Sequence, residues 1–196
     1  MNSIKTIGTI LLLLLSIVGL RQSDSATSKT TSSGKIHFST INQIGLIVGA
    51  DGPQLELQSI NGVRYNSWFA GAGIGLDYYY SKSIAVFMDV RKNLFIKTWP
   101  VYLYADAGIN IPWVKKLETW EGKHEYEKGL YYDAGFGYRF RISNQSAIII
   151  NAGYSVKAFT EKISTGSVCI GGPCPEDKEQ VNYQLRRISI KAGLQF

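Results

Sequence analysis

The chain has 196 residues, of which 45% are hydrophobic, 12% aromatic and 18% charged, and its formal net charge is +6. This length suits one domain, or one domain that follows a processed leader. The ordinary apolar content excludes a disordered chain and a bundle of membrane helices, while 20 Gly and 12 Tyr beside few charges are unusual for a soluble enzyme.

Residues 1–25 are predicted to be a secretory signal peptide. Lys5 supplies a positive start, an apolar stretch runs from Ile7 to Leu20, and small residues near Ser25 offer a cleavage site. The apolar stretch is shorter than the roughly 20 residues that a membrane-spanning helix needs. We expect residues 26–35 to form a flexible lead-in and residues 36–196 to form the only domain.

From about Ile41 onward, apolar residues alternate with polar ones, which is typical of strands with two different faces. In the last strand the apolar face consists of Ile188, Ile190, Ala192, Leu194 and Phe196. The opposite faces of the strands carry glycine, some tyrosine and ten charged residues: Asp77, Asp89, Arg91, Asp106, Asp133, Arg139, Arg141, Lys157, Arg187 and Lys191.

Two architectures fit this alternation. In a soluble sandwich or lipocalin-like barrel the apolar faces form the core, whereas in a transmembrane barrel they meet lipid and the polar faces fill the interior. A water-exposed face would carry many Glu and Lys and few Gly, but a narrow barrel interior needs small residues and paired charges. The pattern favours the transmembrane barrel, in which the ten charged residues form an interior ion-pair network. A soluble periplasmic barrel that binds an apolar ligand stays as an alternative.

Strands are predicted near residues 38–50, 54–80, 83–95, 99–111, 115–123, 126–142, 146–160 and 181–196. Eight strands place both ends of the domain at the same rim. Asn61-Gly62 could form a hairpin turn, but we expect a kink within 54–80 instead. Short turns at 81–83 and 143–146 are expected at one rim and the long connection 161–180 at the other. Aromatic residues near strand ends are expected to form membrane-interface girdles: Tyr78, Tyr80, Tyr138, Phe140 and Phe196.

The long connection holds the two cysteines, Cys169 and Cys174, on either side of the turn-forming sequence Ile-Gly-Gly-Pro. Export would place them in an oxidising compartment, where a close pair forms a disulfide. A zinc site needs further ligands nearby, and a redox-active pair has a two-residue spacing followed by a helix. We therefore expect a disulfide that closes a surface loop, and no metal site.

The last nine residues, Ile188–Phe196, resemble the terminal strand of bacterial outer-membrane barrels, and residues 68–79 and 131–140 resemble their Gly-x-Gly-x-x-aromatic strands. Over residues 41–196 the chain is similar to the small outer-membrane barrels with a Bacteroidota-type beta-barrel domain, which are built like the OmpA/OmpX-like barrels. The resemblance implies an all-β fold, an eight-stranded antiparallel transmembrane β-barrel with long extracellular loops. It also implies residence in the outer membrane of a Gram-negative bacterium, with Phe196 as the signal that the barrel assembly machinery reads. No catalytic residue is carried over.

Few motifs suggest chemistry. The glycines Gly71, Gly73 and Gly75 share one strand face with no helix after them, so packing explains them better than a dinucleotide loop does. His37 and Ser39 resemble the His-x-Ser pair of outer-membrane lipid A deacylases, in which a base activates a serine. They lie at the start of the first strand, the periplasmic rim in this topology, whereas the pair of that family faces the outer leaflet.

Two further features are expected to be structural. His124, Glu125 and Glu127 are predicted to form a solvated loop rather than a metal site. The basic residues are spread along the strands without an aromatic–basic groove, which argues against a nucleic-acid partner and favours anionic lipid headgroups or lipopolysaccharide phosphates.

The sequence thus predicts a monomeric outer-membrane barrel whose loops carry any binding activity. Its partners would be outer-membrane lipids, lipopolysaccharide and the assembly machinery, and no cofactor or enzymatic activity is expected. The interior should be filled by side chains and should not act as a general diffusion pore. An enzyme that acts on outer-leaflet lipid, through His37 and Ser39 or through loop residues, is the alternative.

Overall fold

The computed structural model describes residues 36–94, 100–114, 116–119, 122–143, 146–165 and 177–196. The predicted leader, the lead-in and the Cys169–Cys174 pair lie outside these residues. In chain order the strands are β1 (His37–Gly49), β2 (Gly52–Tyr65), β3 (Trp68–Asp77), β4 (Ser83–Asn93), β5 (Val101–Pro112), β6 (Lys116–Thr119), β7 (Gly122–Glu127), β8 (Gly129–Arg141), β9 (Ala147–Thr165) and β10 (Asp177–Gln195). None of the residues described forms a helix of the length and apolarity needed to cross a membrane.

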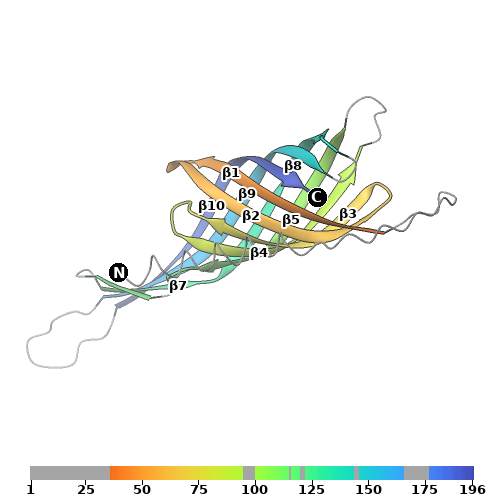
Figure 1. Cartoon of the computed structure of the whole chain (residues 1–196). Coiled ribbons are helices and arrows are strands. Elements are labelled where there is room, and N and C mark those ends of the chain that lie inside the picture. Colours follow the sequence, from red (N-terminus) through yellow and green to blue (C-terminus); the bar gives the residue numbers. More distant parts are fainter. Residues whose placement is uncertain (1–35, 95–99, 115, 120–121, 144–145, 166–176) are drawn as a thin grey trace, which may run out of the picture. The chain divides into compact units, whose positions relative to one another are not determined.

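Eight of these strands close into an antiparallel barrel in the order β1-β2-β3-β4-β5-β8-β9-β10 (Figure 1). Closure occurs because β10 pairs with β9 on one side and with β1 on the other, from Ile41↔Gln195 to Val48↔Ile188. We call the rim where β1 begins and β10 ends the terminal rim, and the opposite one the far rim. Closing the sheet leaves no unpaired edge in the barrel wall, which a lipid environment requires.

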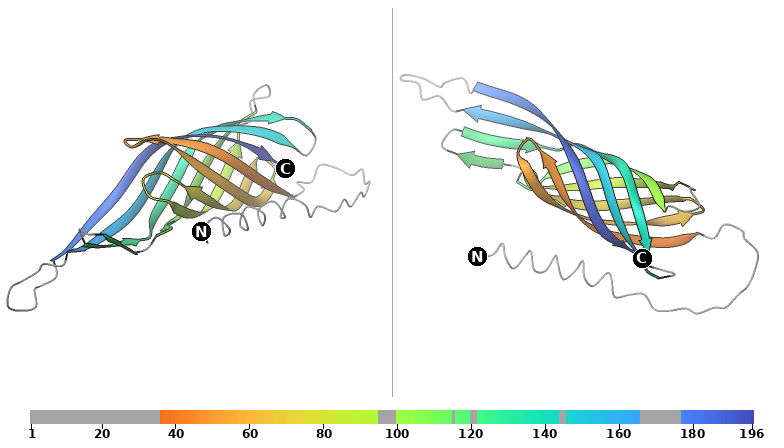
Figure 2. Two further views of the ribbon diagram at one scale, coloured as in Figure 1. Left: turned by 60° about the vertical axis from the view of Figure 1, so that its left-hand side comes forward. Right: turned by 90° about the horizontal axis from the view of Figure 1, so that it is seen from above.

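A smaller sheet continues the barrel wall beyond the far rim. β7 pairs with the outer part of β9, from Lys123↔Ser164 to Glu127↔Thr160, and β6 pairs with β7. β10 stays paired with β9 outward to Asp177, well past its last contact with β1. Together these segments form a four-stranded sheet, here called the sheet extension, which projects from one side of the barrel in both views of Figure 2.

The predicted strand number is confirmed for the barrel, but two of the predicted strands are wrong. Residues 54–80 are not one kinked strand, because β2 and β3 are joined by a two-residue turn at Asn66 and Ser67. Asn66 has a φ of 52°, a left-handed conformation that asparagine tolerates better than most residues. Residues 115–123 do not contribute a barrel strand, because the described part of that segment belongs to the β6–β7 hairpin.

These two errors leave the predicted number of barrel strands unchanged, but they change which turns lie at which rim. With a turn at Asn66 and Ser67, the turn at 81–83 lies at the far rim, the rim beyond which β9 and β10 extend. The turn at 143–146 joins β8 and β9 on the side of the terminal rim. The prediction that both short turns share one rim is therefore wrong. Asn61 and Gly62, where a kink was expected, keep regular pairing with both β1 and β3.

The two faces of the strands lie as the alternation predicts. Ile190 on β10 exposes 54% of its surface on the outer wall, whereas its neighbour Lys191 exposes 1% inside. The same inversion holds around the barrel, whose exposed outer side chains include Ile44, Leu46, Ile74, Val86, Met88, Leu103, Phe136 and Ile150. Exposed apolar residues around a buried charged interior are stable when the outer wall meets lipid. The fold is therefore an eight-stranded transmembrane β-barrel, and the alternative with an apolar core is wrong.

Aromatic side chains of the outer wall gather near the rims. At the terminal rim the exposed rings are those of Phe38, Tyr65, Trp68, Phe140 and Phe196. Tyr78 lies on the outer wall at the far rim, with the Lys82 ammonium 5.8 Å from its ring centroid. Tyr80 was expected in the same girdle but turns across the barrel mouth, since its ring lies 5.5 Å from that of Tyr183.

Candidate functional site

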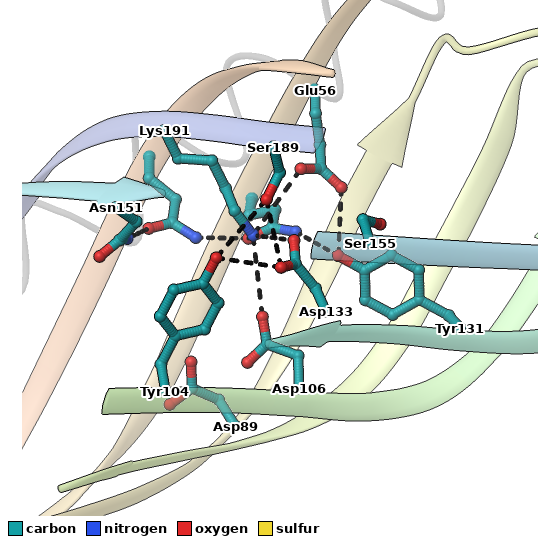
Figure 3. Close-up of polar contacts among 12 residues, drawn as sticks. Glu56, Asp89, Tyr104, Asp106, Tyr131, Asp133, Asn151, Ser155, Ser189 and Lys191 are labelled. Atoms are coloured by element: carbon teal, nitrogen blue, oxygen red, sulfur yellow. Dashed lines mark hydrogen bonds and ion pairs between the residues drawn. The ribbon is translucent and has the colours of Figure 1, made fainter. Parts of the chain in front are cut away.

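The largest group of interior charges surrounds Lys191 of β10 (Figure 3). Its Nζ lies 2.6 Å from Asp133 Oδ2, 3.8 Å from Asp106 Oδ2 and 3.9 Å from Glu56 Oε2. We call these four residues the Lys191 cluster. All four are buried, and they come from β10, β8, β5 and β2. One ammonium group therefore connects strands on different sides of the barrel.

Neutral donors supply further contacts to the carboxylates of this cluster. The Tyr104 hydroxyl donates to Asp133 Oδ1 at 3.0 Å, and the Ser189 hydroxyl donates to the same oxygen at 3.2 Å. The Tyr131 hydroxyl donates to Glu56 Oε1 at 3.2 Å. Three carboxyl groups face a single lysine here, so these hydroxyl groups supply hydrogen bonds that Lys191 alone does not provide.

A second group, nearer the far rim, has the opposite ratio of charges. Arg187 Nη1 donates to Asp77 Oδ2 at 2.5 Å, and Lys157 Nζ lies 3.6 Å from Asp77 Oδ1. Arg187 Nη2 also donates to the Ser155 hydroxyl at 2.8 Å. Two buried cations therefore share one carboxylate.

The third group, on the terminal side, is a direct pair. Arg91 Nη2 donates to Asp89 Oδ2 at 2.7 Å, and Arg91 Nε donates to the same carboxylate at 2.9 and 3.0 Å. The guanidinium also donates to the Tyr102 hydroxyl at 3.3 Å. Both members of the pair are fully enclosed by the barrel.

These three groups contain eight of the ten charged residues predicted for the interior: Asp77, Asp89, Arg91, Asp106, Asp133, Lys157, Arg187 and Lys191. Arg139 and Arg141 stand apart from the network. Arg139 donates to Asn93 Oδ1 at 3.1 Å, and Arg141 is exposed at the terminal rim. Neither forms an ion pair with a carboxylate in the part of the chain that the structure describes. Both lie on β8 beyond the last inward-facing aspartate of that strand.

Glu56 is the network member that the sequence analysis missed. Its strand alternates Leu55 and Leu57, both exposed on the outer wall, with the buried Glu56 and Gln58. That alternation was visible in the sequence, but without the turn at Asn66 the faces of residues 54–65 were not assigned.

The β3–β4 loop, residues 78–82, folds over the far mouth of the barrel. Lys157 Nζ donates to the backbone carbonyls of Tyr79, at 3.0 Å, and Ser81, at 2.6 Å. The Tyr79 hydroxyl accepts a hydrogen bond from the Asp51 backbone N–H at 2.9 Å. The loop is thus fixed to the β1–β2 turn on the adjacent side of the wall and to β9, which is not a neighbour of β3 or β4.

The Tyr79 ring itself enters the barrel, where only 1% of the residue is exposed. The Arg187 guanidinium lies 5.3 Å from its centroid, within the range of a cation–π contact. Gly49 provides the space, because a Cβ there would lie 2.3 Å from the Tyr79 hydroxyl oxygen. Tyr79 therefore occupies the far mouth of the barrel directly above the interior charges.

An aromatic cluster of Tyr80, Tyr126, Phe159 and Tyr183 continues from this loop onto the sheet extension. Phe159 and Tyr183 are stacked with centroids 4.9 Å apart, and Tyr80 lies 5.8 Å from Phe159. Tyr80 has a φ of 60°, an uncommon conformation for a large residue, and this conformation accompanies its ring's turn onto β9 and β10. The cluster thus attaches the loop to the extension.

Beside the aromatic cluster, a histidine and a carboxylate pair within the extension. His124 Nδ1 lies 2.8 Å from Glu161 Oε1, and both side chains are largely buried. Burial raises the pKa of Glu161, but hydrogen bonds from His124, Tyr126 and Tyr183 outweigh it and leave this pKa below its ordinary value. Burial and the contact with Glu161 raise the pKa of Tyr126 to about 12, so this hydroxyl remains a donor at neutral pH.

The Glu161 contacts predict that acid weakens the extension. A carboxyl whose pKa is lower in the folded state stabilises that state above its unfolded pKa, and this contribution is lost as the pH falls through the folded value. At pH values below about 4, we expect the hydrogen-exchange protection factors of the amides of β7 and outer β9 to decrease. Glu161→Gln should remove this pH dependence, whereas Glu127→Gln, in the exposed pair with Lys162, should retain it. Equal protection at pH 3 and pH 7 in the unsubstituted chain would contradict the prediction.

The candidate catalytic pair at the terminal rim lacks its activating contact. The Ser39 hydroxyl donates to the Phe196 carbonyl at 2.8 Å and accepts from Gln195 Nε2 at 3.1 Å. No hydrogen bond joins Ser39 to His37 among the described residues, and His37 is exposed at the start of β1. In the same residues no group of three or more His, Cys, Asp or Glu side chains is arranged to hold a metal ion.

Comparison with known proteins finds similarity at the level of the fold. No protein-family model and no curated protein matches the chain. Among solved structures it is similar to outer membrane protein AlkL, determined by solid-state NMR in DMPC bilayers, with 9% identity, a TM-score of 0.49 and coverage of 90% of this chain and 96% of that one. It is also similar to the crystal structure of Neisserial surface protein A (NspA), with 12% identity, a TM-score of 0.42 and coverage of 84% and 98%. At this distance the similarity says nothing about activity.

Proposed function

We propose that this chain is an integral outer-membrane protein of a Gram-negative bacterium, a closed barrel that presents the sheet extension and the far-rim loops outside the cell. An even number of antiparallel strands, both ends at one rim and longer structure at the other are the general features of outer-membrane barrels. In this orientation the terminal rim faces the periplasm. The signal peptide at 1–25 and the resemblance to the Bacteroidota-type family are parts of the same proposal.

The observation that carries the closed-barrel part is the continuous filling of the interior. Arg91, the Lys191 cluster, Arg187 and Tyr79 follow one another from the terminal side to the far mouth, and all are buried. Arg91, Lys191 and Arg187 contact side chains of other strands, and Tyr79 is bonded to the backbone of the β1–β2 turn. A barrel of eight strands is just wide enough for side chains to fill it. A path for solutes would require several of these buried ion pairs to break together, and each is costly to break.

In this proposal, partners outside the cell bind the sheet extension and the far-rim loops. The sheet extension and the residues that lead into β8 carry exposed charged side chains, including Lys123, Glu127 and Lys128. The predicted Cys169–Cys174 disulfide would close the loop between β9 and β10. Lipopolysaccharide would surround the far rim, and the exposed ring of Phe196 would be read during assembly.

Planar-bilayer recording tests the closed barrel. The purified chain should give no large, stable conductance under conditions in which a general porin inserted as a positive control conducts. Tyr79→Gly should also remain closed, because the Lys191 cluster still fills the barrel below the far mouth. Stable water-filled conductance from the unsubstituted chain would overturn the proposal.

Cell fractionation tests the location separately. The chain should be recovered with the outer membrane, should need detergent for extraction, and should migrate faster on a gel unboiled than boiled, as closed barrels do. Release by osmotic shock without detergent would contradict an outer-membrane location.

A further inference from the structure

Four arginines converge inside the terminal mouth of the barrel. We call Arg64 of β2, Arg91 of β4, and Arg139 and Arg141 of β8 the arginine cluster. Arg64 lies opposite Phe69, and Phe69 lies opposite Arg91, in the register of β2, β3 and β4. The guanidinium groups of Arg91 and Arg139 lie 5.5 and 5.3 Å from the centroid of the same ring, that of Tyr102. Arg141 follows two residues after Arg139 on the same face of β8. Such a convergence of like charges is unfavourable unless an anion is placed among them.

The chain supplies little negative charge at this end. Asp89 is the carboxylate that contacts the cluster, and it is already bonded to Arg91 through three hydrogen bonds. No ion pair is found for Arg64, Arg139 or Arg141 among the described residues. The connections between strands on this side, residues 66–67, 94–100 and 142–146, contain no Asp or Glu in their sequence, and neither do residues 26–35.

Several guanidinium N–H groups of this cluster also lack an acceptor. Nε and Nη2 of Arg64 and Nε of Arg139 are buried and make no hydrogen bond in the part of the chain that the structure describes. Buried donors without acceptors cost free energy, more so when they are charged. The aromatic rings beside them offer faces rather than acceptor oxygens: Tyr102 lies 5.3 Å from the Arg139 guanidinium. An acceptor with several oxygens and a negative charge would satisfy these donors and balance the arginine charges.

We propose that the arginine cluster binds an oxyanion of the phosphate class, which enters from the terminal rim. The guanidinium groups of Arg64 and Arg139 present forked N–H donors that match phosphate oxygens, and Arg141 adds positive charge at the entrance. Arg91 stays hydrogen-bonded to Asp89. A soluble phosphate and the phosphate of a phospholipid headgroup share this chemistry. The site does not depend on the closed-barrel proposal, and its orientation in the membrane decides only which compartment supplies the ligand.

Thermal unfolding in the presence of anions tests this site. The full chain in an uncharged maltoside detergent is titrated with inorganic phosphate or pyrophosphate, with chloride at equal ionic strength as the reference. The unfolding midpoint should rise by several degrees with phosphate or pyrophosphate, because a ligand that binds only the folded state stabilises it. The double variant Arg64→Gln/Arg139→Gln should lose this rise and should unfold no earlier than the unsubstituted chain without anion, since repulsion is relieved.

The matched control is Lys123→Gln/Lys128→Gln, which removes two exposed positive charges on the side of the far rim and should keep the full rise. Gel mobility before boiling shows whether the double variant folds. If it does not, Arg139→Lys is used instead, because it keeps the positive charge but removes the parallel N–H donors of the guanidinium group. This variant should weaken binding roughly tenfold.

Phosphatidic acid added to the micelles separates the two sources. A rise with phosphatidic acid alone identifies a lipid headgroup, and a rise with inorganic phosphate or pyrophosphate identifies a soluble oxyanion. No rise with any of these, or an equal rise in the double variant, overturns the proposal.

Discussion

Replacing Lys191 with Met is expected to lower the free energy of unfolding of the barrel by about 3–5 kcal/mol. The substitution leaves Glu56, Asp106 and Asp133 buried without their shared cation. Removing one partner of a buried ion pair is far more costly than replacing the whole pair, because the remaining charges stay desolvated. Equilibrium unfolding in denaturant, followed by tryptophan fluorescence of the chain in lipid bilayers, measures the change.

Lys162→Met is the matched control, because it removes a lysine from the exposed pair with Glu127 on the sheet extension. This substitution should leave the unfolding transition almost unchanged, since exposed pairs contribute little. Adding Asp133→Asn to Lys191→Met should recover part of the loss, because one of the uncompensated charges is then removed. A loss in Lys191→Met no larger than in Lys162→Met would show that Lys191 does not hold the interior together.

Sequence reasoning was most successful for the two faces of the strands. Alternation with a period of two is a local property, so Lys191 and Ile190 could be assigned to opposite faces from their neighbours alone. Because alternation is local, it did not reveal the turn at Asn66 and Ser67. It contains no glycine or proline, and alternation on both sides of it makes residues 54–80 look like one strand.

The partners of the interior charges could not be predicted, because they depend on the register between strands. Lys191 lies opposite Gly45 of β1, and Gly45 lies opposite Glu56 of β2. A Cβ at Gly45 would lie 2.6 Å from Lys191 Cγ, so this glycine gives the lysine a path across β1. Only after the barrel has closed do Lys191 and Glu56 become neighbours.

Register also explains why the sequence did not reveal the arginine cluster. Arg139 and Arg141 have the same inward parity as Asp133, and parity alone placed them in the network. The structure places them past the last carboxylate of β8, beside Arg64 from a strand whose faces had not been assigned. Arg139 and Arg141 form no ion pair among the described residues because they lie near the terminal end of β8. Alternation does not tell how far along the barrel axis a residue lies.

Replacing Gly135 with Val should lower the free energy of unfolding by about 3 kcal/mol, the second largest loss we expect. A Cβ at this position would lie 2.1 Å from the Ala152 carbonyl oxygen and 2.5 Å from Gly153 Cα. Both are backbone atoms of β9, so no side-chain rotation relieves the contact, and β8 and β9 must move apart. Gly135 also lies opposite Tyr104 in the β5–β8 register, and Tyr104 bonds to Asp133.

The control for Gly135 is the preceding residue of β8, Ala134, whose side chain faces outward. Ala134→Val adds bulk toward lipid and should change the free energy of unfolding by no more than about 0.5 kcal/mol, as measured by the same denaturant titration. Equal losses in the two variants would mean that the interior has room for a side chain at this level. The glycine at this position would then not be needed for the packing of β8 against β9, and side chains would not fill the barrel at this level.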